Sequence, residues 1–301
     1  MPAIPPLMTA ALAAVSAGTA LLPPPADRWA ALAVIILLGI PHGALDGEVA
    51  RPWLRPRFGA WWFAAFALPY LLLAGLVLWG WRLAPEPVLA GFLPLSVLHF
   101  GEEDAGPGRP LEAFSRGGLP IALLVLLHPA ATADILGTVM GVSLPAVPGW
   151  LWAGALAWLV LLPGAVFVMH RQGRLHALLE ISFLGLVFAL LPTLSAFALY
   201  FVAIHAPRHM AALAAHPTRA PRVRSLRGAV WHGLPVTGLT LLLGAGLWPL
   251  YAGDPGQRLL ALTVQGLAAL TLPHLLLGWV DGHAGATSGR PGRALQATPS
   301  P

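Results

Sequence analysis

The chain has 301 residues, of which 57% are hydrophobic and 10% are charged, and its mean hydropathy is +0.75. Soluble domains carry about 25% charged residues, so this composition predicts an integral membrane protein. The absence of cysteine excludes disulfides, iron–sulfur clusters, thiolate metal sites and a cysteine nucleophile. All 17 basic residues are arginines in short segments between apolar runs, so the net charge of +5 indicates lipid headgroups rather than nucleic acid as the partner.

Ten apolar runs are long enough, or nearly so, to span a bilayer, which takes about 20 residues per helix. They are Leu7–Leu22, Trp29–Leu45, Ala60–Gly80, Val88–Phe100, Leu119–Val142, Trp150–Met169, Ala177–Leu191, Leu194–Ala211, Ala229–Tyr251 and Leu259–Val280. Pro192 is expected to separate the seventh and eighth runs, which together are too long for one span. The first run is expected to be a membrane helix rather than a cleaved signal, because prolines and no basic residue precede it.

Arginine placement supports an all-α, polytopic bundle of about ten transmembrane helices. With the N-terminus inside, fourteen of the 17 arginines fall in cytoplasmic segments, and only Arg28, Arg82 and Arg258 fall outside. The positive-inside rule predicts this bias. We therefore expect a multi-pass protein of the cell membrane with both termini in the cytoplasm. Residues 1–282 would form a single membrane domain, and residues 283–301 a disordered tail.

Five histidines lie in apolar, helix-length runs, where a polar ring is costly. They are His42, His99, His205, His209 and His274. All of them lie toward the ends of even-numbered runs, which travel inward in the predicted topology, so they should gather near the cytoplasmic boundary. Imidazoles at one depth indicate a buried metal site, for which iron, copper, zinc and nickel are all suitable ions.

Acidic residues follow several of these histidines at helical spacing. Asp46 and Glu103 each come four residues after a histidine, and Asp281 comes seven residues after His274, so each pair shares a helix face. A metal-bound imidazole usually donates its other N–H to a carboxylate or carbonyl. These acids are therefore candidates to orient a ligand, on the same helix or on another one.

Prolines adjoin the histidines at three places, Pro41, Pro207 and Pro273. Each removes a backbone donor and is expected to distort its helix at that point. Such distortions persist at membrane depth where a cavity or another group satisfies the backbone.

Two further polar residues lie within apolar runs. Glu180 would be either a partner for a histidine or for Arg208, or a side chain that reaches out to the interface. His128, in a Leu-His-Pro sequence without an acidic neighbour, is expected to be a packing or cavity residue.

The ordered set of motifs resembles the Brp/Blh family of bacterial and archaeal β-carotene dioxygenases. The matching segments run from residue 39 to 281 and are Pro41-His42-Gly43 with Asp46, His99-Phe100-Gly101 with Asp104, Ala198-Leu199-Tyr200-Phe201 leading to His205 and His209, and Pro273-His274 with Asp281. Each segment alone is a weak signal, and their order along the chain makes the set specific.

The resemblance implies a membrane enzyme that uses Fe(2+) and O2 to split β-carotene at its central 15,15′ double bond into two molecules of all-trans-retinal. It implies that four histidines hold the iron, with no catalytic residue beyond the iron centre, and the matching positions are His42, His99, His205 and His209. The other motif residues would support these ligands or line the substrate pocket, and they are Asp46, Glu103, Asp104, His274 and Asp281. The product suggests a functional link to a retinal-binding opsin.

Two other functions remain open from the sequence. One is a non-catalytic membrane protein that binds carotenoid or retinal, or that assists opsin assembly. The other is a metal or proton transporter, which would need polar residues continuing across the bilayer, whereas the outer halves of these runs offer few. Imidazole nitrogens that converge on one point would favour the enzyme, and histidines on separate faces would favour packing.

Overall fold

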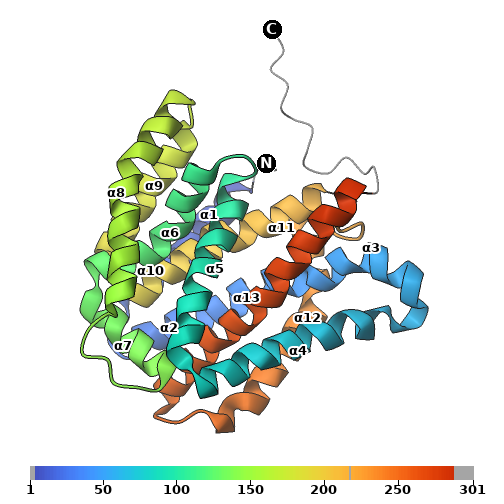
Figure 1. The fold of residues 1–301 in the computed structure, drawn as a ribbon, viewed down its shortest axis with the longest axis horizontal. Coiled ribbons are helices and arrows are strands. Elements are labelled where there is room, and N and C mark those ends of the chain that lie inside the picture. The colour runs from blue at the N-terminus through green and yellow to red at the C-terminus, as the bar shows by residue number, and fades with distance from the viewer. Residues whose placement is uncertain (1–3, 217, 288–301) are drawn as a thin grey trace.

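The computed structural model describes residues 4–216 and 218–287, with side chains up to residue 281. Within these residues the chain forms thirteen α-helices joined by short 3-10 and π segments, and no strand (Figure 1). The predicted all-α class is confirmed. The last helix extends to Thr287, past the predicted domain boundary at residue 282, and the rest of the predicted tail lies outside the described residues.

Most α-helices coincide with the predicted apolar runs. The helices are α1 (Pro6–Gly18), α2 (Ala26–Val34), α3 (Asp46–Phe58), α4 (Trp62–Leu83), α5 (Pro85–Ala105), α6 (Pro110–Leu127), α7 (Pro129–Met140), α8 (Gly149–Arg171), α9 (Leu175–Leu190), α10 (Thr193–Leu199), α11 (Ala206–Ala215), α12 (Leu226–Leu247) and α13 (Pro255–Thr287). The break expected at Pro192 is confirmed, because α9 ends at Leu190 and α10 begins at Thr193.

One predicted run, Leu119–Val142, is two helices rather than one. The chain leaves the helical conformation at His128, whose φ and ψ are −131° and 52°, between α6 and α7. The reason is Pro129, since a proline disfavours the α conformation of the residue before it. His128 lies at this junction, where its Nε2 is 2.6 Å from the Phe188 carbonyl oxygen, a contact of the packing kind that we expected.

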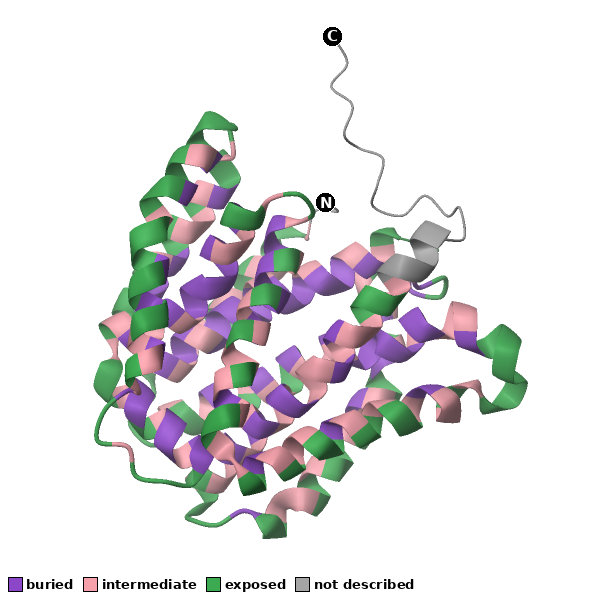
Figure 2. Ribbon diagram, in the orientation of Figure 1, coloured by how far each residue is buried: buried purple, intermediate pink, exposed green. Residues whose placement is uncertain are grey.

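The outer surface of the bundle is apolar. Five of the described helical stretches are long and apolar enough to cross a membrane, and they lie within residues 26–83, 110–127, 149–171, 226–250 and 255–281. Large apolar side chains are exposed on α4, α8 and α12, where Leu72, Val160 and Leu242 have 65%, 76% and 72% of their surface exposed. Figure 2 shows exposed residues along the outer faces of α4 and α8. Soluble monomers rarely expose apolar patches of this extent, so these faces are suited to lipid.

Close helix packing positions the elements that carry the histidines. Helix α6 packs between α5 and α8, and α13 packs against α4 and α7 (Figure 1). At the α5–α6 crossing the two backbones touch, because a Cβ on Gly117 would collide with the Val97 carbonyl and lie 2.6 Å from the Gly101 nitrogen. This contact lies one turn or less from His99 and holds the end of α5 in the core of the bundle.

Candidate metal centre

Two irregular helical segments carry two of the predicted ligands. The π-helix η2 (Ile35–Gly39) leads into the 3-10 segment η3 (Ile40–Leu45), which holds His42, and the π-helix η5 (Tyr200–His205) leads into α11. Pro41 and Pro207 follow these π-helices and lack the N–H that a regular α-helix would use there. Single π turns are frequent at functional sites, because they re-aim the side chains around them. Pro273 differs in that it lies inside α13, which continues through it as an α-helix.

The structure brings all five predicted histidines together. The ring centroids of His99 and His205 are 5.0 Å apart, those of His42 and His205 are 5.5 Å apart, and those of His42 and His209 are 5.6 Å apart. His274 joins the cluster at 4.9 Å from His99 and 5.2 Å from His209. The first four residues are buried, and His274 is nearly so. Five rings from η3, α5, η5, α11 and α13 thus meet in one place.

Ring nitrogens in the cluster are close enough to share one ion. The Nε2 atoms of His99 and His205 are 3.3 Å apart. One nitrogen from each of His42, His99 and His205 lies within 4.8 Å of the others, and His99, Glu103 and His274 form a second such group. Nitrogens bound to one ion at about 2.1 Å are themselves about 3 to 4 Å apart. The spacing of these donor atoms therefore approaches that of a metal site.

Asp46 orients a ring on a different helix. Its Oδ1 accepts a hydrogen bond from Nδ1 of His274 at 2.8 Å, and its Oδ2 accepts one from the Tyr70 hydroxyl, also at 2.8 Å. Sequence reasoning did not single out Tyr70. A signal was present, because the chain has only 3 tyrosines and a buried tyrosine hydroxyl usually has a polar partner.

Glu103 likewise serves a ring of another helix. Its Oε1 lies 2.7 Å from Nδ1 of His209, and it is also 3.9 Å from Nε2 of His274. His42 is different, since its Nδ1 contacts the Gly39 carbonyl oxygen of its own segment. The acids that follow the histidines in sequence thus act across helices, one of the two possibilities that the sequence left open.

Three buried polar atoms in the cluster lack a hydrogen-bond partner. They are Nε2 of His209, Nδ1 of His205 and Oε2 of Glu103. Buried polar atoms in native proteins are almost always paired, so the unpaired Nε2 of His209 and Oε2 of Glu103 are what a metal-binding set would present, whereas Nδ1 of His205 faces Asp104 at 3.7 Å. Imidazole and carboxylate donors together suit a divalent transition metal. The residues present therefore fit such an ion.

Asp104 belongs to an ionic network beside the rings. Its Oδ1 is 2.6 Å from the Arg208 guanidinium and 3.7 Å from Nδ1 of His205, and its Oδ2 accepts a hydrogen bond from the Tyr200 hydroxyl at 3.0 Å. Burial opposes ionisation of Asp104, but Arg208 outweighs it and holds the pKa of this carboxyl well below its usual range. Arg208 also pairs with Glu180 at 2.7 Å, which confirms one of the two roles expected for Glu180.

Asp281 lies apart from the contacts described above. Its Oδ2 is 2.6 Å from Nε of Arg219, so the structure pairs it with the loop that follows α11 rather than with His274.

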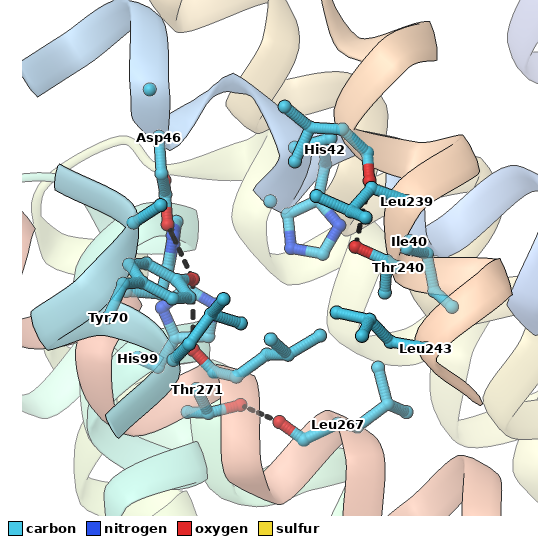
Figure 3. Close-up of a pocket in the computed structure, with 18 of the residues that line it drawn as sticks. Ile40, His42, Asp46, Tyr70, His99, Leu239, Thr240, Leu243, Leu267 and Thr271 are labelled. Carbon is cyan, nitrogen blue, oxygen red and sulfur yellow. Dashed lines mark hydrogen bonds and ion pairs between the residues drawn. The ribbon is translucent and has the colours of Figure 1, made fainter. Parts of the chain in front are cut away.

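A cavity adjoins the histidines (Figure 3). His42, His99, His274 and Asp46 line it, and apolar side chains of α4, α12 and α13 form much of the remaining wall. The apolar wall residues include Phe63, Phe66, Leu71, Leu239, Leu243, Leu267 and Leu270. Two hydroxyls in the wall, Thr240 and Thr271, donate to carbonyls of their own helices and so present little polarity to the interior.

Fold and site together define a polytopic, all-helical membrane protein in which a buried histidine cluster opens onto an apolar cavity. A family model described as beta-carotene 15,15'-dioxygenase matches residues 33–281. The chain belongs to this family, which confirms the resemblance found in its sequence motifs.

Two curated relatives are similar over most of their length. The chain is 30% identical to the probable beta-carotene 15,15'-dioxygenase Blh of Halobacterium salinarum, over 90% of this chain and 89% of the relative. It is 26% identical to the beta-carotene 15,15'-dioxygenase of an uncultured marine bacterium, 66A03, over 83% of this chain and 92% of the relative. No solved structure matches the chain.

Proposed function

We propose that this protein is an Fe(2+)-dependent dioxygenase that cleaves β-carotene at its 15,15′ double bond into two molecules of all-trans-retinal. The observation that carries the proposal is the opening of the histidine cluster onto the apolar cavity, through His42, His99 and His274. A long, apolar polyene suits such a cavity, and a metal-binding set at its wall suits oxidation of that polyene. The names of both relatives support the same reaction.

The iron would be held by His42, His99, His205 and His209. When bound there, it supplies the redox chemistry that activates dioxygen toward a carbon–carbon double bond. Neutral imidazoles favour the ferrous state, and the nearby carboxylate of Glu103 offsets the charge of the ion. Because Glu103 contacts Nδ1 of His209, Nε2 of that ring is left free to bind metal.

His274 is assigned an orienting role rather than a place among the ligands. Its Nδ1 is 2.8 Å from Asp46, and its Nε2 is 3.9 Å from Glu103, so the ring lies between two carboxylates. This assignment follows the family motifs, in which the other four histidines match the metal positions and His274 belongs to a further motif. His274 would then connect Asp46 and Glu103 beside the cavity.

The cavity would bind the polyene and exclude water from the reacting bond. Three of its wall residues, Leu71, Leu239 and Leu243, are 42%, 42% and 45% exposed on the outer surface of α4 and α12. The cavity wall is thus continuous with the apolar face suited to lipid. β-Carotene dissolved in the bilayer could pass between these two helices, and the distance from this opening to the histidines would select the bond that is cleaved.

The arginine distribution supports a place for this centre near the cytoplasmic face of the cell membrane. Retinal made there would be released into the bilayer, where a retinal-binding opsin could take it up. This link follows from the product alone.

Expression in cells that accumulate β-carotene tests the proposal. We expect the orange pigment to be lost and all-trans-retinal to appear in solvent extracts analysed by chromatography, and His205→Ala to abolish both changes. Purified protein should lose activity after chelation and recover it with Fe(2+) but not with Zn(2+), which has no redox chemistry. A correctly inserted chain that leaves β-carotene intact, or that only retains it on purification, would instead support the non-catalytic carotenoid-binding function.

A further inference from the structure

Six charged side chains form a continuous chain of alternating sign beside the histidine cluster, and we name it the charge ladder. Its members in spatial order are Arg174, Glu112, Arg116, Glu180, Arg208 and Asp104. Arg174 and Glu112 are 2.8 Å apart, and Arg116 and Glu112 are 3.0 Å apart. The ladder begins with Arg174 at the start of α9 and continues through α6, back to α9 at Glu180, and on to α11. It ends on α5 at Asp104, the residue that follows Glu103.

Three members of the ladder are deeply buried, and the Glu180 and Arg208 side chains are partly so, at 21% and 17% exposed. Glu112, Arg116 and Asp104 are 3%, 6% and 2% exposed, respectively, whereas the Arg174 side chain at the far end is 30% exposed. Removing charges from water is costly even when they are paired, so a buried ion-pair network is weak evidence for stability by itself. The ladder therefore calls for a role other than stability, and the contacts of Arg208 indicate that this role is to position helices.

Arg208 bridges two helices while it sits between two proposed ligands. It lies on α11, three residues after His205 and one before His209. One arm of its guanidinium binds Asp104 of α5 at 2.6 Å, and the other binds Glu180 of α9 at 2.7 Å. A planar guanidinium can hold two carboxylates in a fixed geometry, which an ammonium group cannot do.

Helices α5 and α11 with its preceding π-helix supply three of the four proposed iron ligands. Asp104 comes directly after Glu103 and five residues after His99 on α5. The bridge between Arg208 and Asp104 therefore determines how far α11 can slide or rotate against α5. The 3.3 Å separation between Nε2 of His99 and Nε2 of His205 depends on that same register.

We propose that Arg208 is a positioning residue for the metal centre, which sets α11 against α5 through Asp104 and Glu180 before the metal binds. This inference rests on the proposed metal-binding function of the cluster. Arg208 touches no proposed ligand atom in this role and is not a catalytic residue. Within the rest of the charge ladder, Arg116 contacts Glu180 directly, whereas Arg174 pairs with Glu112 at the far end.

Titration with Co(2+) tests this role without relying on catalysis. The full-length protein in detergent is freed of metal with a chelator, and Co(2+) is then added while its ligand-field absorption is recorded. We expect Arg208→Gln to weaken Co(2+) binding by about 10- to 100-fold, the range for loss of groups that orient metal ligands. The absorption bands should also change in position or intensity, because the ligand geometry becomes less uniform.

Arg174→Gln is the matched control. It removes an ion pair of the same ladder at the end remote from the histidines, so Co(2+) affinity and the absorption bands should stay as in the wild type. Should Arg208→Gln fail to insert, Arg208→Lys carries the test. Its ammonium keeps the charge but cannot bridge both carboxylates, so we expect weaker binding than in the wild type.

The outcomes separate this inference from the proposed function. Wild-type affinity and bands in Arg208→Gln or Arg208→Lys would overturn the positioning role, as would an equal loss in Arg174→Gln, and the metal site would stand in either case. A wild-type protein that binds neither Co(2+) nor Fe(2+) would overturn both.

Discussion

His274 on α13 and Asp46 on α3 are 228 residues apart in the chain, yet Nδ1 of the ring lies 2.8 Å from Oδ1 of the carboxylate. This bond joins α13 to the start of α3, which directly follows the segment η3 that carries His42.

Asp46→Asn tests whether this bond supports the function of the metal centre. The amide keeps the size of the side chain but removes the charge that holds His274, so we expect cleavage of β-carotene to fall about 10- to 100-fold while the chain keeps its metal, as measured by retinal yield and elemental analysis. Tyr70→Phe, which removes only the hydroxyl that donates to Asp46, should have a smaller effect on cleavage in the same direction. A wild-type retinal yield in Asp46→Asn would show that the carboxylate has no such role.

His274→Asn tests the assignment of this ring as an orienting group. We expect the variant to retain stoichiometric metal after dialysis, with lowered activity, because the four proposed ligands remain. His205→Ala, in contrast, should lose the metal, since its Nε2 lies at the centre of the cluster. The amount of metal per chain, measured by elemental analysis, decides whether His274 is an orienting group or a ligand. A metal-free His274→Asn would make His274 a ligand.

Gly39→Ala tests the packing beneath the cluster. A Cβ at this position would collide with the ring of Phe201, which in turn stacks on His205 with ring centroids 5.8 Å apart. Overpacking of this kind costs about 1–3 kcal/mol, so we expect a lower melting temperature together with reduced cleavage. Phe201→Leu should partly restore both.

The control for this variant is Gly75→Ala on α4, where a Cβ would meet nothing within 4 Å. It should melt at or above the wild-type temperature, because alanine favours helix. Equal melting temperatures for Gly39→Ala and Gly75→Ala would contradict the predicted collision.

Leu243→Trp tests the cavity as the carotenoid site. The larger ring would occupy space between α12 and the histidines, so we expect β-carotene cleavage to fall by about 10²-fold through misplacement of the substrate. Leu242→Trp is its neighbour-matched control, since Leu242 is 72% exposed on the lipid-facing side of α12. Retinal yields measured in the same cells should be normal for Leu242→Trp. A normal yield for Leu243→Trp would place the substrate elsewhere.

Several features could be read from residues alone because they depend on local chemistry. The apolar runs predicted the helices, and Pro192 predicted a break, since a proline cannot continue a helix. Leu119–Val142 was wrong as a single helix, although Pro129 carried the same signal. Periodicity could not reveal the π-helices at Ile35–Gly39 and Tyr200–His205, which arise where packing and proline compete for the same backbone groups.

What the sequence determined by itself is the inventory: a membrane bundle, five histidines in apolar helices, acids at helical spacing, and the motif order of a family. Only the tertiary structure decided the pairing, with Asp46 on His274, Glu103 on His209 and Arg208 between Asp104 and Glu180. The physical reason is the distance along the chain over which each kind of contact can be predicted. Helical spacing constrains neighbours within two turns, whereas a hydrogen bond between helices depends on crossing geometry, which is set by side-chain packing over the whole bundle.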